Sequence, residues 1–549
     1  MALGASPLTG TGCNAEEPVD SSGPLPGLVR SARHADLRWP AFPEFRAELE
    51  RLYERAGWRL LWLHDARPTE AATQLIARLA AADSLGLDPA DYDADWLDRE
   101  ARELAALDGA PAPEELARFD LGLSVAAVRF VSALHRGRVS PYRVNAELFI
   151  PRASLAVEMA VDSLRDAGQQ GFLLERLQPR IHHYHLLKNG LARYRALERD
   201  TSLVPLPATP SALKPGMRLE TASRLRRLLE ATGDLIALWP VAPAADTVYS
   251  PDLVAGVRKF QIRQGSEPDG VIGPATAARL SRPFAQRVRQ IELALERFRW
   301  LPVSFSAPPI LVNIPAFRIY AYRDWTVREA DLLAMNVVVG RAFSTRTPVF
   351  AAEMKYLIFR PYWEVPASIM RAELRPKAMK DPEYLQRHGM VLVSGESDDA
   401  QALPATRENL ARIGSGLRIR QLPGPSNALG LVKFMLPNAY NVYLHDTPTK
   451  DLFASARRDL SHGCIRLADP VALAAHVMRD QPEWTVDRIR AAMEGDDNTR
   501  VNLLAPIPVY IVYTTASARE DGDVHFYTDI YGLDAKLDQL LRKGYPYPK

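Results

Sequence analysis

The stretch that decides the fold reads Ser461-His462-Gly463-Cys464-Ile465-Arg466. Cys464 is one of two cysteines in 549 residues, and it follows a histidine by two positions. A second histidine lies upstream in Tyr443-Leu444-His445-Asp446-Thr447-Pro448, with 16 residues between His445 and His462. A thiol with an imidazole nearby is the minimal apparatus for acyl transfer through a thioester, because backbone N–H groups can hold the oxyanion. Cys464 is therefore a candidate nucleophile, and a small buried cysteine without a catalytic role is the alternative that the spacing alone leaves open.

The flanks of Cys464 refine this prediction. Gly463 permits a tight turn or a close approach of substrate to the backbone. We expect His462 and Arg466 to place positive potential beside the sulfur and so to favour the thiolate. The N–H groups of Gly463 and Cys464 are candidates for the oxyanion hole. A strand would point His462 and Cys464 to the same face, so the residue pattern leaves either His462 or His445 as the base.

Bulk composition excludes several other classes of function. The chain is 47% hydrophobic and 24% charged, which is typical of globular domains, and its length predicts several of them. A net charge of +2 gives no global field for nucleic acid. No C-x-x-C, Walker, dinucleotide or H-E-x-x-H motif occurs, so we expect neither a metal nor an organic cofactor. No run of 18 apolar residues predicts a transmembrane helix.

The N-terminal part is predicted to be helical after a disordered leader. Residues 1–37 are rich in Gly, Pro and Ser, without a signal-peptide pattern. The sequence before Cys13 faintly resembles a lipoprotein cleavage site, which makes Cys13 a candidate for lipidation. Apolar residues then recur at helical spacing, and we expect a helical scaffold domain over 38–200.

The middle of the chain predicts a small helical module. Four prolines mark residues 201–216 as a linker. Three short helices follow over 217–282, the last one after the turn Asp269-Gly270-Val271-Ile272-Gly273. A connecting helix is expected within 283–305.

From Ile310 the apolar period changes to two, which predicts a β-rich domain over 306–515. Residues 363–425 break this pattern and are expected to form an inserted cap. In the C-terminal segment, 516–549, we expect a late strand over 524–531 to close the sheet. The predicted fold class is therefore multidomain α+β.

Two resemblances add to this interpretation. The 217–282 module resembles the small peptidoglycan-binding domain of bacterial wall enzymes, through Val257, Phe260, Gln261, Asp269, Gly270, Gly273, Thr276 and Leu280. The string from His445 through Ser461-His462-Gly463-Cys464-Ile465-Arg466 resembles the signature of the L,D-transpeptidase (YkuD-type) catalytic domain. The domain order resembles that of the larger Gram-negative YcbB-like members.

The second resemblance implies roles for individual residues. Cys464 would be the acylated nucleophile, and His445 would take and return the proton. His462 and Gly463 would shape the turn. The implied substrate-contacting residues are Arg466, Tyr443, Trp363 and Ser461, although Arg466 could instead brace the loop and the aromatic residues could be core.

The resemblance also implies an activity: a periplasmic peptidoglycan L,D-transpeptidase that links third-position stem residues. Its partners would be a tetrapeptide donor stem, a neighbouring acceptor stem and other wall-synthesis enzymes, with carbapenem β-lactams as inhibitors. Three alternatives stay open. These are an L,D-carboxypeptidase or cross-link hydrolase that uses water, a non-enzymatic wall-binding scaffold, and a papain-like protease, which would need an Asn or Asp to orient the histidine.

Overall fold

The computed structural model describes residues 23–145, 150, 154–207, 212–236, 247–324, 332–342, 345–381, 383–395 and 400–547. The chain divides into two compact units. The first comprises Met1–Asp83, Asp88–Ser132 and Leu155–Glu175, and the second comprises Ser84–Leu87, Ala133–Ser154 and Arg176–Lys549. Cys13 lies outside the described residues, so its lipidation stays a prediction.

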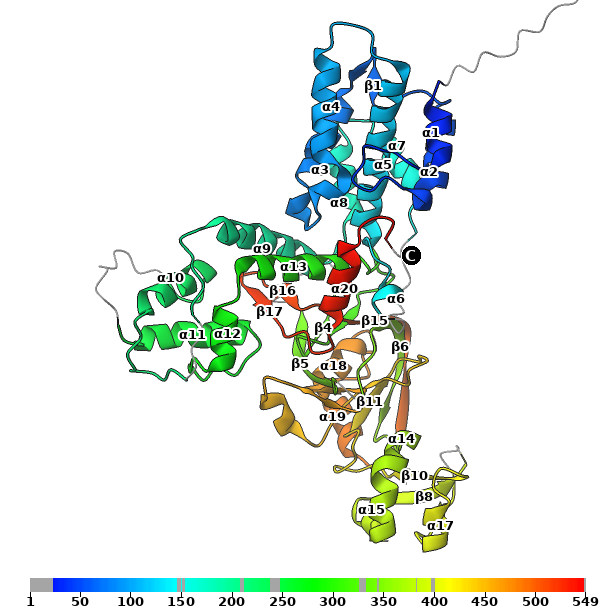
Figure 1. The fold of residues 1–549 in the computed structure, drawn as a ribbon. Helices are drawn as coiled ribbons and strands as arrows, with labels where there is room; N and C mark the ends of the chain where they lie inside the picture. Colours follow the sequence, from blue (N-terminus) through cyan, green and yellow to red (C-terminus); the bar gives the residue numbers. More distant parts are fainter. Residues whose placement is uncertain are drawn as a thin grey trace, which may run out of the picture. The chain divides into compact units, whose positions relative to one another are not determined.

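The first unit is built of helices around a long central one (Figure 1). Its helices are α1 (Leu25–Ser31), α2 (Arg46–Arg55), α3 (Glu70–Ala80), α4 (Ala94–Ala106), α5 (Pro113–Arg136), α7 (Val157–Ser163) and α8 (Gln170–Leu177). The middle of α5 is buried on every side, as its nearly unbroken apolar sequence requires. Even Asp120 is buried there, where it accepts hydrogen bonds from the Tyr53 hydroxyl and the Trp62 N–H.

Two boundaries of the predicted helical region need correction. The leader was expected to be disordered through residue 37, but α1 forms within it, because Leu25 and Val29 lie one turn apart and both become buried. The scaffold was expected to extend to residue 200, but α9 (His182–Arg199) belongs to the second unit. Its apolar face, including Leu187 and Leu191, packs in one core with α13 (Phe284–Phe298).

The three predicted helices of the small module are present in the second unit. They are α10 (Ala222–Thr232), α11 (Pro251–Arg263) and α12 (Pro274–Leu280), and they share one apolar core. The predicted linker is partly packed on this module, since Leu206 joins the core and Leu213 forms a β-bridge with Ile272. At the end of α11, the buried Arg263 donates hydrogen bonds to the Tyr194 hydroxyl and the Val524 carbonyl.

The β-rich domain is a nine-stranded sheet in the order β13-β5-β14-β12-β11-β6-β15-β3-β4. Its strands are β3 (Ile310–Asn313), β4 (Arg318–Ala321), β5 (Leu333–Gly340), β6 (Phe350–Phe359), β11 (Val432–Met435), β12 (Leu444–His445), β13 (Asp459–Ser461), β14 (Ile465–Leu467) and β15 (Thr499–Val512). A further pairing joins β4, the last strand of this order, to β5, so the sheet closes on itself and β13 remains beside β5 as the one strand of these nine with a single neighbour. Helices α18 (Pro470–Val477) and α19 (Val486–Glu494) follow β14.

The inserted cap is a subdomain with a core of its own. Its sheet has the order β7-β10-β8-β9. The strands are β7 (Trp363–Glu364), β8 (Met390–Ser394), β9 (Ala402–Leu403) and β10 (Leu417–Gln421). Helices α14 (Ala367–Ile369), α15 (Arg375–Lys380), α16 (Tyr384–Arg387) and α17 (Arg407–Ala411) pack on it, and a π-helical turn spans Met370–Leu374. The cap lies in the chain between β6 and β11, which are hydrogen-bonded neighbours in the large sheet.

The C-terminal segment differs from its prediction. The strand expected over 524–531 does not close the large sheet. Instead β17 (Val524–Phe526) pairs with β16 (Ala516–Ala518) in a separate hairpin. This hairpin is buried against α9 and α13, because Val524, Phe526 and Ala518 are apolar on the side that faces those helices. Helix α20 (Leu533–Arg542) ends the segment.

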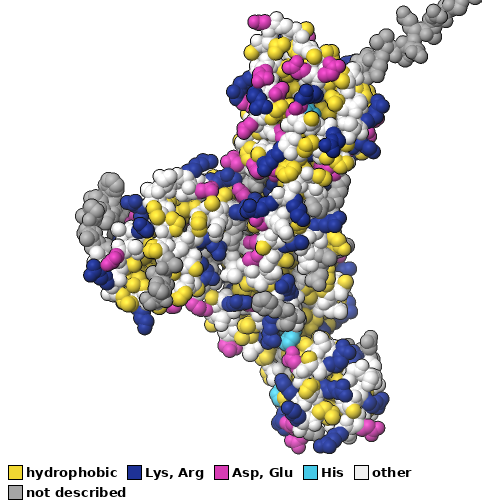
Figure 2. Space-filling model, viewed as in Figure 1, with side chains coloured by type: hydrophobic (Ala, Val, Ile, Leu, Met, Phe, Trp, Pro, Cys, Tyr) yellow, Lys and Arg dark blue, Asp and Glu magenta, His cyan; other side chains and the backbone are white. Residues whose placement is uncertain are grey.

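The surface carries mixed charge. On the face drawn in Figure 2, basic and acidic side chains are interspersed, which agrees with the small net charge of +2. No helix in the described ranges is both long and apolar enough to cross a bilayer.

Candidate active site

The candidate site lies on one face of two parallel strands. β12 pairs with β14 in a register that places Leu444 opposite Ile465 and His445 opposite Arg466. Leu444 and Ile465 are fully buried in the domain core. Because side chains alternate along a strand, His445 and Arg466 point to the other face. Tyr443 and Cys464, which directly precede the two strands, lie two residues before His445 and Arg466 and therefore share that face. The hydrogen bond from the Ile465 N–H to the Tyr443 carbonyl holds this register at 3.1 Å.

Cys464 is half-buried, and its sulfur has two polar neighbours. The thiol donates a long hydrogen bond to the Asn441 carbonyl at 3.8 Å, and the Tyr443 side chain hydrogen-bonds to the sulfur. Burial raises the pKa of the Cys464 thiol, and this effect exceeds the opposing effects of Tyr443 and of the Arg466 and Lys433 charges. The resting sulfur is therefore a neutral thiol. Arg466 lowers the pKa of the thiol, as expected from its charge, but desolvation of the sulfur outweighs this effect. The expected effect of His462 on the sulfur stays a prediction.

His445 is only 4% exposed and has a fixed orientation. Its Nδ1 lies 2.5 Å from the Asp446 carbonyl oxygen, which can only accept, so Nδ1 carries the proton of the neutral ring. Nε2 is then the nitrogen with the lone pair. Burial, together with the Arg466 charge, lowers the pKa of His445 to about 3, against the smaller opposing effects of the Asp446 and Leu429 backbones. The ring is neutral at neutral pH and contacts the Tyr443 ring edge-on, with centroids 5.8 Å apart.

Residues 461–464 form a turn between β13 and β14, and this changes two expectations. Ser461 is buried, and its hydroxyl accepts a hydrogen bond from the Gly463 N–H at 3.1 Å and donates one to the Cys464 carbonyl at 2.6 Å. Ser461 therefore braces the turn, and its predicted contact with substrate stays a prediction. The Gly463 N–H is also occupied, so of the two predicted oxyanion donors only the Cys464 N–H donates no hydrogen bond to any described residue.

The turn requires glycine, and the Thr347 hydroxyl holds it in place. Gly463 has a φ of +117°, which side chains disfavour. Its carbonyl accepts a hydrogen bond of 2.7 Å from the buried Thr347 hydroxyl, which in turn accepts one from the Gly340 N–H at 2.8 Å. The sequence pattern contained no signal for this support, since Thr347 lies more than a hundred positions from Gly463.

His462 contacts the cap. It lies in the turn, so the strand alternation that would have placed it beside Cys464 does not apply. The exposed ring has its Nε2 2.7 Å from the Oε1 of Glu373, in the π-helical turn of the cap. Trp363 also belongs to the cap, where it is partly buried against the apolar core of the cap, and its predicted contact with substrate stays a prediction.

Arg466 is half-buried and has unused donors. Its Nε is buried with no acceptor among the described residues. Burial lowers the pKa of Arg466, and Arg341 lowers it further, whereas the Cys464 sulfur raises it. Unpaired buried N–H groups are costly, so this guanidinium is suited to receive an incoming carboxylate.

One residue of this face was not singled out from the sequence. Lys433 on β11 lies opposite His445 in the antiparallel register, and its Nζ lies 6.0 Å from the centre of the Tyr443 ring. Its charge lowers the pKa of Cys464. The alternation of buried Val432 and Phe434 around Lys433 was the available signal, but it identifies a face only once the neighbouring strand is known.

Comparisons with known proteins identify three segments of the chain. Residues 308–503 match the model of the "L,D-transpeptidase catalytic domain", 220–280 match the "Putative peptidoglycan binding domain" and 47–191 match the "Scaffold domain". The chain therefore carries a YkuD-type L,D-transpeptidase catalytic domain together with a peptidoglycan-binding domain.

Two individual proteins are similar to this chain. A Haemophilus influenzae protein named "Putative L,D-transpeptidase" is 29% identical over 250 residues, which cover 46% of this chain and 49% of that protein. The chain thus spans about half the length of this curated relative. A crystal structure of a fused zinc-dependent amidase, peptidase and peptidoglycan-binding protein from Clostridium acetobutylicum is 14% identical with a TM-score of 0.14, over 55% of this chain and 100% of that chain.

Proposed function

We propose that the protein is a peptidoglycan L,D-transpeptidase that acts through a thioester on Cys464. The observation that carries this proposal is the common face of the β12–β14 pair, which presents the thiol, a neutral imidazole and an unpaired guanidinium together. These three groups supply a nucleophile, a base and a binding point for a carboxylate.

Acylation starts from a neutral thiol and a neutral imidazole. Nε2 of His445 takes the thiol proton while the sulfur attacks the carbonyl carbon that follows the third stem residue, and the carbonyl oxygen becomes an oxyanion. The Cys464 N–H is the backbone donor for that oxyanion. The C–N bond then breaks, and the imidazolium returns the proton to the amine of the leaving D-alanine. The products are a thioester and free D-alanine.

Transfer reverses these proton movements. A side-chain amine of a neighbouring stem attacks the thioester carbonyl, and His445 accepts a proton from that amine. The C–S bond breaks, and the sulfur recovers its proton from the imidazolium. The new amide joins two third-position residues. Arg466 would bind a substrate carboxylate during acylation, because its buried Nε has no acceptor in the described part of the chain.

Inhibition and location follow from the same chemistry. A carbapenem presents a strained amide carbonyl to the same thiol and would leave a stable acyl-enzyme on Cys464. Since the stem peptides lie outside the inner membrane, the proposal places the enzyme in the periplasm, next to other wall-synthesis enzymes.

Incubation with a disaccharide-tetrapeptide, followed by mass analysis of the products, tests the proposal. We expect a cross-linked dimer and free D-alanine. Accumulation of the tripeptide instead would show that water is the acceptor and that the protein is an L,D-carboxypeptidase. Absence of both products, with folded protein, would leave only a wall-binding role. Cys464→Ala is the control, and it should form neither product while its melting temperature stays unchanged.

A further inference from the structure

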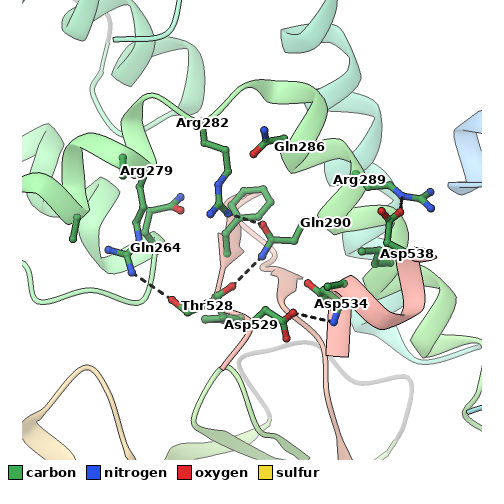
Figure 3. A pocket seen from close by; sticks show the side chains of 16 residues that line it. Gln264, Arg279, Arg282, Gln286, Arg289, Gln290, Thr528, Asp529, Asp534 and Asp538 are labelled. Atoms are coloured by element: carbon green, nitrogen blue, oxygen red, sulfur yellow. Dashed lines mark hydrogen bonds and ion pairs between the residues drawn. The ribbon is translucent and has the colours of Figure 1, made fainter. Parts of the chain in front are cut away.

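A cavity of about 520 Å³ lies away from the cysteine, beside α12, α13 and the C-terminal segment (Figure 3). Its walls come from the end of the small helical module, from α13 and from residues 526–538. No residue of the β12–β14 face lines it. The volume is within the range of ligand pockets and is sufficient for a short peptide.

One wall of the cavity carries two arginines that have no carboxylate partner among the described residues. Arg279 is half-buried on α12, and the one described atom that its Nη2 reaches is the Thr528 hydroxyl, at 3.4 Å. Arg282 follows one turn later with an exposed side chain and, among the described residues, donates only to the Gln290 side-chain oxygen at 3.4 Å. Figure 3 shows both side chains directed toward the hollow. Burial and the Arg282 charge both lower the pKa of Arg279. An anion between the two guanidinium groups would offset the desolvation of Arg279 and its repulsion by Arg282.

A third donor lies at the same wall. Gln264 is 3% exposed, and its oxygen accepts a hydrogen bond from Arg287 at 2.7 Å. Its Nε2 is buried and has no acceptor in the described residues. A buried amide N–H without a partner is uncommon in a folded protein, and a ligand oxygen would satisfy it.

The acidic residues of the opposite wall are already engaged. Asp538 pairs with Arg289 at 2.6 Å, and Asp534 pairs with Arg297 and accepts from the Thr515 hydroxyl. Asp529 accepts hydrogen bonds from the Tyr513 hydroxyl and from two backbone N–H groups. None of these three carboxylates forms an ion pair with Arg279 or Arg282 in the described part of the chain.

We propose that this cavity is a second peptidoglycan subsite, in which Arg279, Arg282 and Gln264 bind a free carboxylate of a stem peptide. Arg279 lies within the segment that matches the peptidoglycan-binding model, and the carboxylates of peptidoglycan are carried by its stem peptides. Two guanidinium groups and an amide N–H are the donor set that a carboxylate requires. The identity of the ligand rests on the proposed function, whereas the carboxylate chemistry rests on the cavity itself.

The test uses the full chain and a disaccharide-tetrapeptide that carries a photoreactive diazirine. After irradiation, labelled peptides are mapped by mass spectrometry. We expect labels on the segments around residues 264–290 and 526–538. The Arg279→Gln/Arg282→Gln variant should reduce this labelling about tenfold, as expected for the loss of charge-assisted hydrogen bonds. Arg258→Gln, which removes an exposed charge from the same module outside the cavity, should leave it unchanged.

Competition with unlabelled ligand identifies the chemistry. The free-acid tetrapeptide should displace the label, and its carboxamide analogue should not. Equal competition by both, or labelling that the double variant leaves intact, would overturn the proposal. Acylation of Cys464 by a carbapenem, followed by intact mass in the same variants, reports separately on the proposed function. We expect acylation to proceed at the wild-type rate in the double variant.

Discussion

The two candidate histidines, His445 and His462, lie in opposite environments, one in the sheet and one facing the cap. His445 lies in the sheet, where it is buried, held by a backbone carbonyl and kept neutral. His462 lies 17 positions further on, is exposed and contacts a carboxylate of the cap. The difference favours His445 over His462 as the proposed base, although His462 is closer to the cysteine in sequence. The strand register places His445 on the same face as Cys464, whereas His462 lies in the turn.

The largest expected effect separates the two histidines. His445→Gln should lower the rate of Cys464 acylation by about 10²–10⁴-fold, because it removes the base from the neutral thiol. His462→Gln should lower that rate by less than about tenfold, because it removes one surface contact. Stopped-flow acylation by a carbapenem measures both rates. A larger loss in His462→Gln would reverse the assignment of the base.

The pH dependence of stability should also distinguish them. Burial and the Arg466 charge lower the pKa of His445 to about 3, so the unfolded chain binds more protons as the pH falls below 6.5. Stability is therefore lost as the pH falls from about 6.5 toward 3, at up to about 1.4 kcal/mol per pH unit for this one group. Urea unfolding across this range should show a shallower slope for His445→Gln. A wild-type slope in that variant would contradict the buried neutral ring, and His462→Gln is the matched control.

The turn between β13 and β14, which carries His462, should be sensitive to a change in its backbone conformation. Gly463→Ala forces a side chain onto a φ of +117° and should lower the free energy of unfolding by about 1–3 kcal/mol. It should also slow acylation, because the Cys464 N–H would move. Gly424→Ala in the cap is the control, since an added Cβ there meets no atom within 4 Å. Equal effects of the two substitutions would show that the turn is not strained.

The contact between turn and cap should have the smallest effect. Glu373→Gln removes the charge that faces His462, and both side chains are partly exposed. We expect a change in stability below about 1 kcal/mol. The ratio of dimer to tripeptide product is the more informative measurement, since a looser cap would admit water. An unchanged ratio would show that this contact does not control the acceptor.

Much of this architecture was predictable because its signals are local. The change from helical spacing to a period of two located the β-rich domain, and the break in that period over 363–425 located the cap. The face shared by His445 and Arg466 depends on a parallel pairing between residues 21 positions apart, which spacing alone does not reveal. The positions of Lys433 beside His445 and of Thr347 beneath Gly463 also depend on contacts between distant segments, which spacing does not reveal. The positive charge of Arg466 near the sulfur could be expected from the sequence, whereas the burial of the sulfur that outweighs it could not.

The most direct test of the account is to trap the thioester. The enzyme is mixed with a disaccharide-tetrapeptide, quenched in acid within milliseconds and analysed by intact mass and peptide mapping. The account predicts a mass increase equal to the disaccharide-tripeptide acyl group, located on Cys464, at near-wild-type levels in His462→Gln and almost absent in His445→Gln. Product formation without an adduct on Cys464, or an adduct that forms equally fast without His445, would contradict it.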